Sequence, residues 1–317
     1  MSMKYDFTTI LNREGTGAIA VSKIPFDNAE IKEGFSKIPM WVADMNYATA
    51  PSVIEAIQNR LAHPVFGYFD IKDAYSESII EWQKTRNGVT DIPKEAIDYE
   101  NGVLGGVSSV LQAFTAPGEA ILLHSPAYIG FIGTITNMGR KIVYSPLKKD
   151  EQGVWRMDYE DMDKKLKENH IHLAIFCTPH NPCGRVWERE EIEKAMEVYE
   201  KNKCLVISDE IWSDLTLEGH KHIPTQSVNE YAHEHTFAFY APSKTFNLAG
   251  LNTSNIIIAD DDLRRRFRKT VTDIGASAIN VMGLTACRAA YESGLPWLQE
   301  VRNYIRGNMD FTASYLA

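Results

Sequence analysis

Cysteine is scarce in this sequence: the four cysteines, Cys177, Cys183, Cys204 and Cys287, form no CxxC pair. The sequence therefore offers neither the framework of a small disulfide-stapled domain nor the ligand spacing of a zinc ribbon. Its HxH pairs lie in polar stretches that are more typical of loops than of metal ligands, so we expect no metal. With no secretory signal ahead of the cysteines, the reducing cytoplasm is the expected location.

Long apolar runs and an excess of basic residues are missing too. Apolar segments such as ILLH (121–124) and NIIIA (255–259) have the length of a strand, not of a membrane span. The net charge of -9 argues against nucleic acid or an anionic membrane as a partner, since both favour clustered Lys and Arg. The isolated basic run 264–266 is interpreted as the solvated face of a helix.

What the sequence contains is an alternation of short β-rich runs with longer amphipathic segments. This pattern predicts an α/β fold in which helices cover a mostly parallel sheet. With 317 residues and 44% hydrophobic content, the chain is large enough for a buried core and for two domains. The expected strands are 120–124, 173–177, 205–208, 236–240 and 255–259, and the clearest helices are 52–62 and 190–201.

Four of these strands run into residues with chemical potential. In chain order these residues are Tyr128, Asn181, Asp209 and Lys244. Because ligands of open α/β sheets bind beyond the carboxyl ends of the strands, we expect the four side chains to converge on one crevice. In addition, a Gly105-Gly106 pair precedes the helical run VSSVLQAF. Small residues at the start of a helix leave backbone N–H groups free to bind a phosphate.

Three motifs around these residues, TPHNPCGR (178–185), SDEIW (208–212) and APSKTFNLAGL (241–251), carry a family resemblance. They resemble the fold-type-I enzymes that depend on pyridoxal 5′-phosphate (PLP), in the aminotransferase class I/II superfamily. MWVADMNYATAP (40–51) and HPVFGY (63–68) resemble its cystathionine β-lyase or cysteine C-S lyase branch, the MalY/PatB type. The resemblance covers essentially the whole chain. It implies the PLP-dependent transferase fold, with a three-layer αβα large domain.

The resemblance also implies roles for the four residues at the strand ends. Lys244 would hold the cofactor as a Schiff base and later take the Cα proton of the substrate. Asp209 would pair with the pyridine nitrogen and keep it protonated. Asn181 would donate to the ring oxygen, and Tyr128 would stack on the ring. Taken alone, an Asp after a strand can cap a helix, Asn-Pro can form a turn and a Tyr can belong to the core.

Further residues match the part of the family that binds the cofactor phosphate. Gly105, Gly106 and Val107 occupy the phosphate cradle, and Ser243 is a further donor. Tyr68 matches a tyrosine that reaches the phosphate of the neighbouring subunit, although an aromatic residue near a glycine can also be ordinary packing. The resemblance therefore implies a homodimer with shared active sites and an amino acid as the small-molecule substrate.

The sequence departs from the family in two places. Many aminotransferases carry an Arg eight positions after the Schiff-base Lys, where this chain has Asn252, and that difference favours the C-S lyase branch. The sequence also stops at Ala317 inside an apparent long helix, so we expect the C-terminal small domain, with its carboxylate-binding Arg, to be largely missing. The predicted division is 1–50 with the small domain, 51–290 as the PLP-binding domain and 291–317 as the start of the small domain.

The leading functional hypothesis is β-elimination from cystathionine or a related S-substituted cysteine, which yields a thiol, pyruvate and ammonia. Transamination is the alternative among enzymes, because it uses the same Lys244 and Asp209. A third possibility is a catalytically impaired protein of the same fold that was retained for binding or regulation. The sequence does not distinguish among preferred cysteine conjugates.

Overall fold

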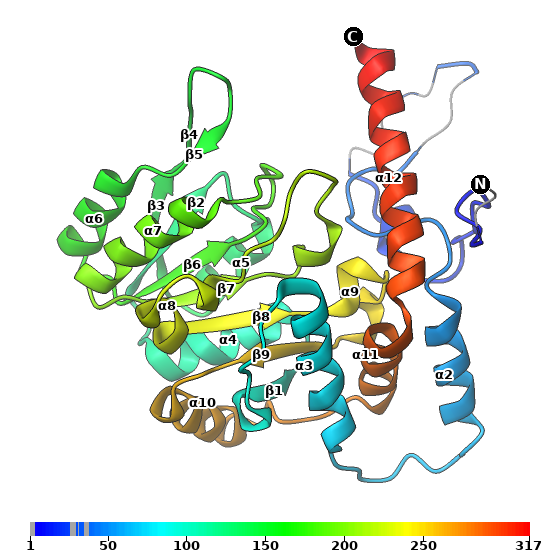
Figure 1. The fold of residues 1–317 in the computed structure, drawn as a ribbon, viewed down its shortest axis with the longest axis horizontal. Coiled ribbons are helices and arrows are strands. Elements are labelled where there is room, and N and C mark those ends of the chain that lie inside the picture. Colours follow the sequence, from blue (N-terminus) through cyan, green and yellow to red (C-terminus); the bar gives the residue numbers. More distant parts are fainter. Residues whose placement is uncertain (1–3, 26–29, 31, 35–37) are drawn as a thin grey trace.

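The computed structural model describes residues 4–25, 30, 32–34 and 38–317. Its centre is a seven-stranded sheet in the order β1-β9-β8-β7-β6-β2-β3 (Figure 1). The strands of this sheet are β1 (Ile97–Glu100), β2 (Ala120–Ser125), β3 (Lys141–Pro146), β6 (Leu173–Cys177), β7 (Leu205–Asp209), β8 (Thr236–Tyr240) and β9 (Ser254–Ile257). A separate antiparallel pair is formed by β4 (Lys148–Lys149) and β5 (Trp155–Arg156).

The strand directions confirm the predicted mostly parallel sheet. Strands β3, β2, β6, β7 and β8 run parallel to one another, and β9 is antiparallel to both β8 and β1. Strand β1 therefore points the same way as β8. All five strands expected from the sequence are present within a residue or two of the predicted bounds. The sequence analysis missed β1 and β3, which lie at the two edges and carry exposed or polar side chains.

Helices connect the strands and cover both faces of the sheet. The α-helices are α1 (Ile19–Ser22), α2 (Pro51–Leu61), α3 (Asp73–Asn87), α4 (Val103–Phe114), α5 (Ile129–Asn137), α6 (Tyr159–Glu168), α7 (Arg189–Lys201), α8 (Glu230–His235), α9 (Pro242–Thr245), α10 (Asp261–Asp273), α11 (Val281–Ser293) and α12 (Leu295–Leu316). Short 3-10 turns are η1 (Lys94–Ala96), η2 (Ser213–Leu215), η3 (Thr225–Ser227) and η4 (Ala249–Leu251). No helix within the described residues is both long enough and apolar enough to cross a membrane.

The alternation of side chains along β2 shows why three layers form. Ile121 and Leu123 are buried in a cluster with α4, α5 and α10, whereas Leu122 is buried on the other face with α6, α7 and α8 (Figure 1). Successive side chains of a strand point to opposite faces, so a strand that is apolar at every position requires cover on both sides. The three-layer αβα prediction is therefore confirmed.

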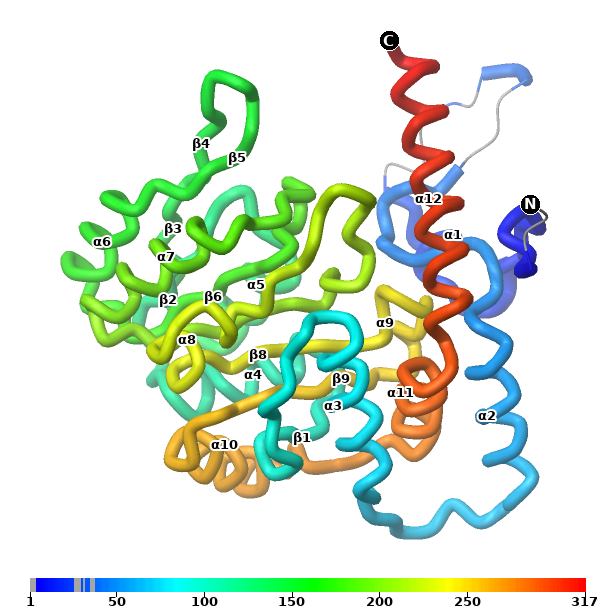
Figure 2. Tube along the Cα trace, in the orientation of Figure 1, coloured from blue at the N-terminus to red at the C-terminus, as the bar shows by residue number. Residues whose placement is uncertain are grey.

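A third apolar cluster joins the N-terminal segment to helices α2, α3, α11 and α12. The ring of Phe7 lies 5.6 Å from the ring of Trp297 and 5.6 Å from that of Tyr304, both on α12. Figure 2 shows α12 running alongside this segment and projecting beyond the sheet. Residues 43–45 and α12 lie on the same side of the molecule as α9, since Lys244 Nζ donates to the Ala43 carbonyl and the Phe246 ring stacks on Trp297 with the centroids 5.7 Å apart.

The basic run 264–266 is only partly solvated, so that interpretation was wrong for Arg264. The Arg264 side chain is buried, and its Nη1 donates to the carbonyl oxygens of Ile258 and Ala259 at 2.7 and 3.1 Å. Arg264 thus links the residues that follow β9 to helix α10. Arg265 remains largely exposed.

Two adjacent glycines in α4 give a matched test of how closely this helix packs against β8. A Cβ at Gly106 would lie 2.1 Å from Phe239 Cε1, whereas a Cβ at Gly105 would meet only Asn101 Cβ, at 3.8 Å. We expect Gly106→Ala to lower the free energy of unfolding by about 1–3 kcal/mol through overpacking. Gly105→Ala should be neutral or stabilising by up to about 1 kcal/mol, because alanine favours the helix. Urea unfolding of both cofactor-free variants measures the difference, and equal effects would contradict this packing.

Candidate active site

The strand order brings the predicted site residues to one edge of the sheet. Strands β8, β7, β6 and β2 are consecutive and parallel, so their carboxyl ends lie side by side. The residues found there are Lys244 after β8, Asp209 at the end of β7, Asn181 after β6 and Tyr128 after β2. Strand β1 points the same way, and the N-terminus of α4 that follows it lies at this edge too.

Lys244 lies on the single turn of α9 with its amine in a polar and aromatic environment. Its Nζ donates to the carbonyl oxygen of Ala43 at 3.2 Å and lies 5.6 Å from the centre of the Trp212 ring. Burial lowers the pKa of Lys244, and the negative charges of Asp209 and Asp44 oppose that effect. A lysine with a lowered pKa more readily provides a neutral, nucleophilic amine.

Asp209 is a buried carboxylate with few donors around it. It is 5% exposed, and its Oδ1 accepts a hydrogen bond of 3.1 Å from the backbone N–H of Ile211. Burial raises its pKa to about 7; the Ile211 hydrogen bond and the positive charge of Lys244 act in the opposite direction. Such a carboxylate is suited to a cationic N–H group brought in by a ligand.

Tyr128 presents its ring toward the same region. The ring packs edge-on against Phe131, with the centroids 5.3 Å apart, and remains 36% exposed. A Cβ at Gly130 would lie 2.4 Å from Tyr128 Cε1, so the ring can adopt this position only over a glycine. Burial, followed by the charge of Asp209, raises the pKa of Tyr128, which indicates that the two side chains are close.

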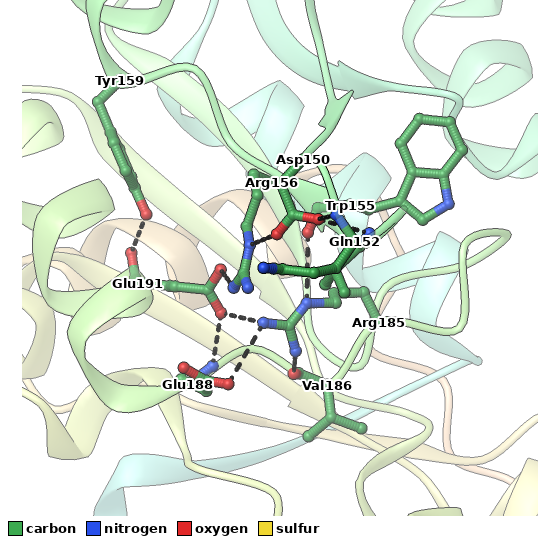
Figure 3. A network of polar contacts seen from close by, with 10 residues as sticks. Asp150, Gln152, Trp155, Arg156, Tyr159, Arg185, Val186, Glu188 and Glu191 are labelled. Carbon is green, nitrogen blue, oxygen red and sulfur yellow. Dashed lines mark hydrogen bonds and ion pairs between the residues drawn. The ribbon is translucent and has the colours of Figure 1, made fainter.

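The loop that carries Asn181 is held by a polar network behind it (Figure 3). Within the loop, the N–H of His180 donates to the Arg185 carbonyl at 2.8 Å, and the Arg185 guanidinium pairs with Glu191 of α7. Arg156 also pairs with Glu191, at 2.8 Å, and with Asp150, at 2.9 Å. The network fixes the loop to α7 and to the β4-β5 hairpin, which leaves Asn181 facing the cavity described below.

The start of α4 corrects the predicted phosphate cradle. The helix begins at Val103, so Gly105 and Gly106 lie within its first turn and do not precede it. The N–H of Gly106 donates to the Gly102 carbonyl at 3.1 Å, and Val107 is fully buried one turn into the helix. Gly106 and Val107 therefore cannot offer free amides. The amides available at this terminus are those of Val103, Leu104 and Gly105.

Two other predicted residues have different surroundings. Ser243 is partly buried and directly precedes Lys244 on α9. Tyr68 lies in the segment between α2 and α3 and is fully exposed. Within the described residues of this chain, Tyr68 is thus not part of the crevice.

A cavity of about 540 Å³ opens in front of Lys244 and Asn181. The side chains that sequence reasoning did not assign to the site include Trp212, Leu215 and Leu217 after β7, and Arg302, Ile305 and Met309 on α12. Asp44 lines the cavity and forms an ion pair with Arg13. Trp41 of the same motif donates from Nε1 to the Ala20 carbonyl, so it packs against the N-terminal segment.

The residues at this edge fit PLP by their chemistry. Asp209 is a buried carboxylate with a raised pKa, as a partner for a pyridinium should be before the ring is present. The first amides of α4 are available to an anion such as the cofactor phosphate, and a Cβ at Gly105 would meet only Asn101 Cβ, at 3.8 Å. Lys244 would supply the amine for the aldehyde. Among the described residues, no three His, Cys, Asp or Glu side chains are grouped as metal ligands.

Comparisons with known proteins agree with this geometry. Residues 36–316 match the family model described as aminotransferase class I and II. Cystathionine beta-lyase PatB of Bacillus subtilis is 38% identical over 88% of this chain and 72% of its own length. Protein MalY of Escherichia coli is 31% identical over 98% of this chain and 77% of its own length. The crystal structure of cystalysin from Treponema denticola, which contains PLP, superposes with a TM-score of 0.91 at 32% identity, covering 98% of this chain and 79% of that one.

The raised pKa of Asp209 predicts how the stability of the cofactor-free chain depends on pH. Because the folded-state pKa, about 7, exceeds that of an unfolded Asp, the contribution of Asp209 to stability is present at low pH and is lost as pH rises toward 7. Relative to Asp209→Asn, the wild type should lose about 3–4 kcal/mol of unfolding free energy between the two pKa values.

Urea unfolding of both cofactor-free proteins from pH 5 to pH 8 would record most of this change. Parallel curves for the two proteins would contradict the raised pKa. Wild type loaded with PLP is the control, because a cation beside Asp209 lowers its pKa and flattens the difference.

Proposed function

Because this chain belongs to the class I and II aminotransferase family, we propose that it is a PLP-dependent carbon-sulfur β-lyase. It would cleave cystathionine or a related S-substituted cysteine to a thiol, pyruvate and ammonia. The observation that carries the proposal is the pair formed by Asp209, at the end of β7, and Lys244, on the α9 turn that follows the neighbouring parallel strand β8. The charge of each residue influences the pKa of the other. Similarity to proteins named cystathionine beta-lyase supports the reaction class.

When bound, PLP supplies the electron sink that allows a proton to leave Cα. Lys244 is the group that takes this proton at Nζ, and its lowered pKa favours the neutral amine that such a base requires. The Ala43 carbonyl and the Trp212 ring hold Nζ on the side of the cavity. As the Cβ–S bond breaks, its electron pair goes to sulfur, and the Lys244 ammonium can return its proton to the departing thiolate.

Asp209 and the residues near it would hold the cofactor. Its carboxylate would keep a proton on the ring nitrogen, because a buried negative charge strongly favours a cation next to it. Asn181 and Tyr128 would fix the ring between them, by an amide donor and by stacking. The amides of Val103, Leu104 and Gly105 would bind the phosphate, with Ser243 as a further donor.

We also propose that the chain works as a homodimer with shared active sites, in which Tyr68 reaches the phosphate of the partner subunit. The full exposure of Tyr68 supports this, as does the exposure of Val65 and Phe66 beside it, since large exposed apolar side chains are typical of interfaces. The four free cysteines support a reducing, cytoplasmic location. The division into 1–50, 51–290 and 291–317 remains a proposal, and residues 1–3, 26–29, 31 and 35–37 lie outside the described part.

The proposed chemistry predicts a specific loss of lyase activity when the Lys244 amine is removed. Lys244→Ala should lower kcat for pyruvate release from L-cystathionine by at least about 100-fold, because a general base contributes about that much or more. Lys164→Ala, which removes a lysine exposed on α6, is the matched control and should resemble wild type. Pyruvate and thiol assays of the PLP-loaded proteins measure the loss.

The products separate this function from its alternatives. Conversion of the cofactor to its amine form with a keto acid product, without thiol release, would indicate transamination instead. PLP binding to wild type without any turnover would indicate a catalytically impaired protein.

The shared-site dimer predicts complementation between two inactive variants. A heterodimer of Lys244→Ala and Tyr68→Ala subunits has one site with both native residues, because each subunit supplies what the other lacks. An equal mixture that exchanges subunits should therefore recover about one quarter of wild-type activity. If the mixture is no more active than its parents although heterodimers form, Tyr68 does not act across the interface.

A further inference from the structure

Asp214 is a buried carboxylate that accepts hydrogen bonds from three different side chains. It lies on η2, shortly after β7, and is 4% exposed. Its Oδ2 accepts from Trp82 Nε1 and from Thr245 Oγ1, each at 3.1 Å. Its Oδ1 accepts from Arg86 Nε at 3.2 Å, and the two side chains form an ion pair. No part of the proposed reaction described above uses this carboxylate.

The three donors belong to two elements that are far apart in sequence. Trp82 and Arg86 are four residues apart on α3, so both side chains lie on the same face of that helix. The Arg86 guanidinium lies 5.9 Å from the centre of the Trp82 ring, which fixes the pair further. Thr245 is the residue after Lys244 on α9 and is fully buried. Asp214 thus joins the rigid helix α3 to the turn that carries Lys244.

The α9 turn needs such an anchor. It contains four residues, and a helix of one turn is unstable without tertiary contacts. Its own closing bond runs from the Phe246 N–H to the Pro242 carbonyl at 2.8 Å. The Thr245 hydroxyl donates the side-chain hydrogen bond by which the turn contacts the buried Asp214 carboxylate. A hydrogen bond from a donor to a carboxylate is strong and directional.

We propose that Asp214 is a positioning residue for Lys244: through the Thr245 hydroxyl it sets the orientation of the α9 turn and so of Nζ. The inference rests on the proposed function of Lys244. Nζ must point toward the cofactor and toward Cα at different stages, and small displacements of a reacting group reduce rates strongly. Asp214 fixes the backbone from which the flexible lysine side chain moves.

The competing explanation is that Asp214 only stabilises the fold as a buried ion pair. The separate donors allow the two explanations to be distinguished. Trp82→Phe removes one donor to Oδ2 and keeps an aromatic ring beside Phe246 at the end of α9. Thr245→Val removes the other donor to the same oxygen with almost no change in volume. Thr245→Ser retains the hydroxyl and tests for rescue.

The experiment compares these variants as PLP-loaded proteins by three readouts. They are the thermal midpoint, the pH at which the visible absorbance of the bound cofactor changes, and kcat and KM for pyruvate release from L-cystathionine. We expect Thr245→Val to shift that pH and to lower kcat by about 10-fold to 100-fold with little change in KM. Trp82→Phe should lower the thermal midpoint without moving the absorbance titration, and Thr245→Ser should resemble wild type.

Two results would overturn the inference. One is an unchanged absorbance titration and kcat in Thr245→Val. The other is the same shift in Trp82→Phe as in Thr245→Val, which would mean a general loss of stability. Should Thr245→Val fail to fold, Thr245→Ala carries the same comparison. The absorbance titration needs no lyase activity, so a wild type without turnover would defeat the proposed function while the titration still decides the role of Asp214.

Discussion

The burial of a carboxylate with too few partners is the constraint on which this site depends. Asp209 is the last residue of β7, Glu210 follows it directly, and both are buried. Glu210 accepts from Ser208 Oγ, Tyr240 OH and the Thr225 N–H, and it lies 2.6 Å from His222 Nε2. Asp209 has the Ile211 amide and the nearby charge of Lys244. Glu210 is satisfied by the protein, whereas Asp209 is left for a cationic ligand.

This contrast explains how adjacent residues at the end of one strand acquire different functions. Successive side chains of an extended chain point to opposite faces, so Glu210 shares a closed polar network with Ser208, whereas Asp209 points to the other face. A fully paired carboxylate tends to rigidify its surroundings, and an underpaired one binds and polarises what approaches it. The rest of the edge is built from loops that are fastened away from the site, by Glu191 behind Asn181 and by Asp214 behind Lys244.

The sequence predicted the parts of the site that depend on local patterns. Apolar runs ended where strands end, and the residues after β2, β6, β7 and β8 were identified because parallel strands share one edge. The phosphate cradle was misplaced because the glycine pair was interpreted as the helix start. The helix begins at Val103, and its N-cap is Gly102, whose φ of 80° lies in the left-handed region that favours glycine. Gly106 is small for another reason, the close approach of Phe239.

Other features had no local signal. Asp214 pairs with Trp82 and Arg86, more than a hundred residues away, and such long-range pairs cannot be inferred from one sequence. The same holds for Arg264, whose charged run suggested a solvated surface although its guanidinium caps the end of β9. Strand β1 was missed because it is short and contains two acidic residues, Asp98 and Glu100, in four positions. This composition is expected of an edge strand but not of a central one.

The two sides of the cavity are built from different kinds of structure, and this separates cofactor chemistry from substrate choice. The side that would face the cofactor contains Asn181 and Lys244, which follow the sheet strands β6 and β8. The opposite wall contains Leu215 and Leu217 together with Ile305 and Met309 of α12, and Arg302 links the two by donating to the Thr216 carbonyl. Substitutions in that wall can change which sulfur substituent fits while Lys244 and Asp209 stay in place. A fold of this kind can therefore keep one reaction and vary its substrates.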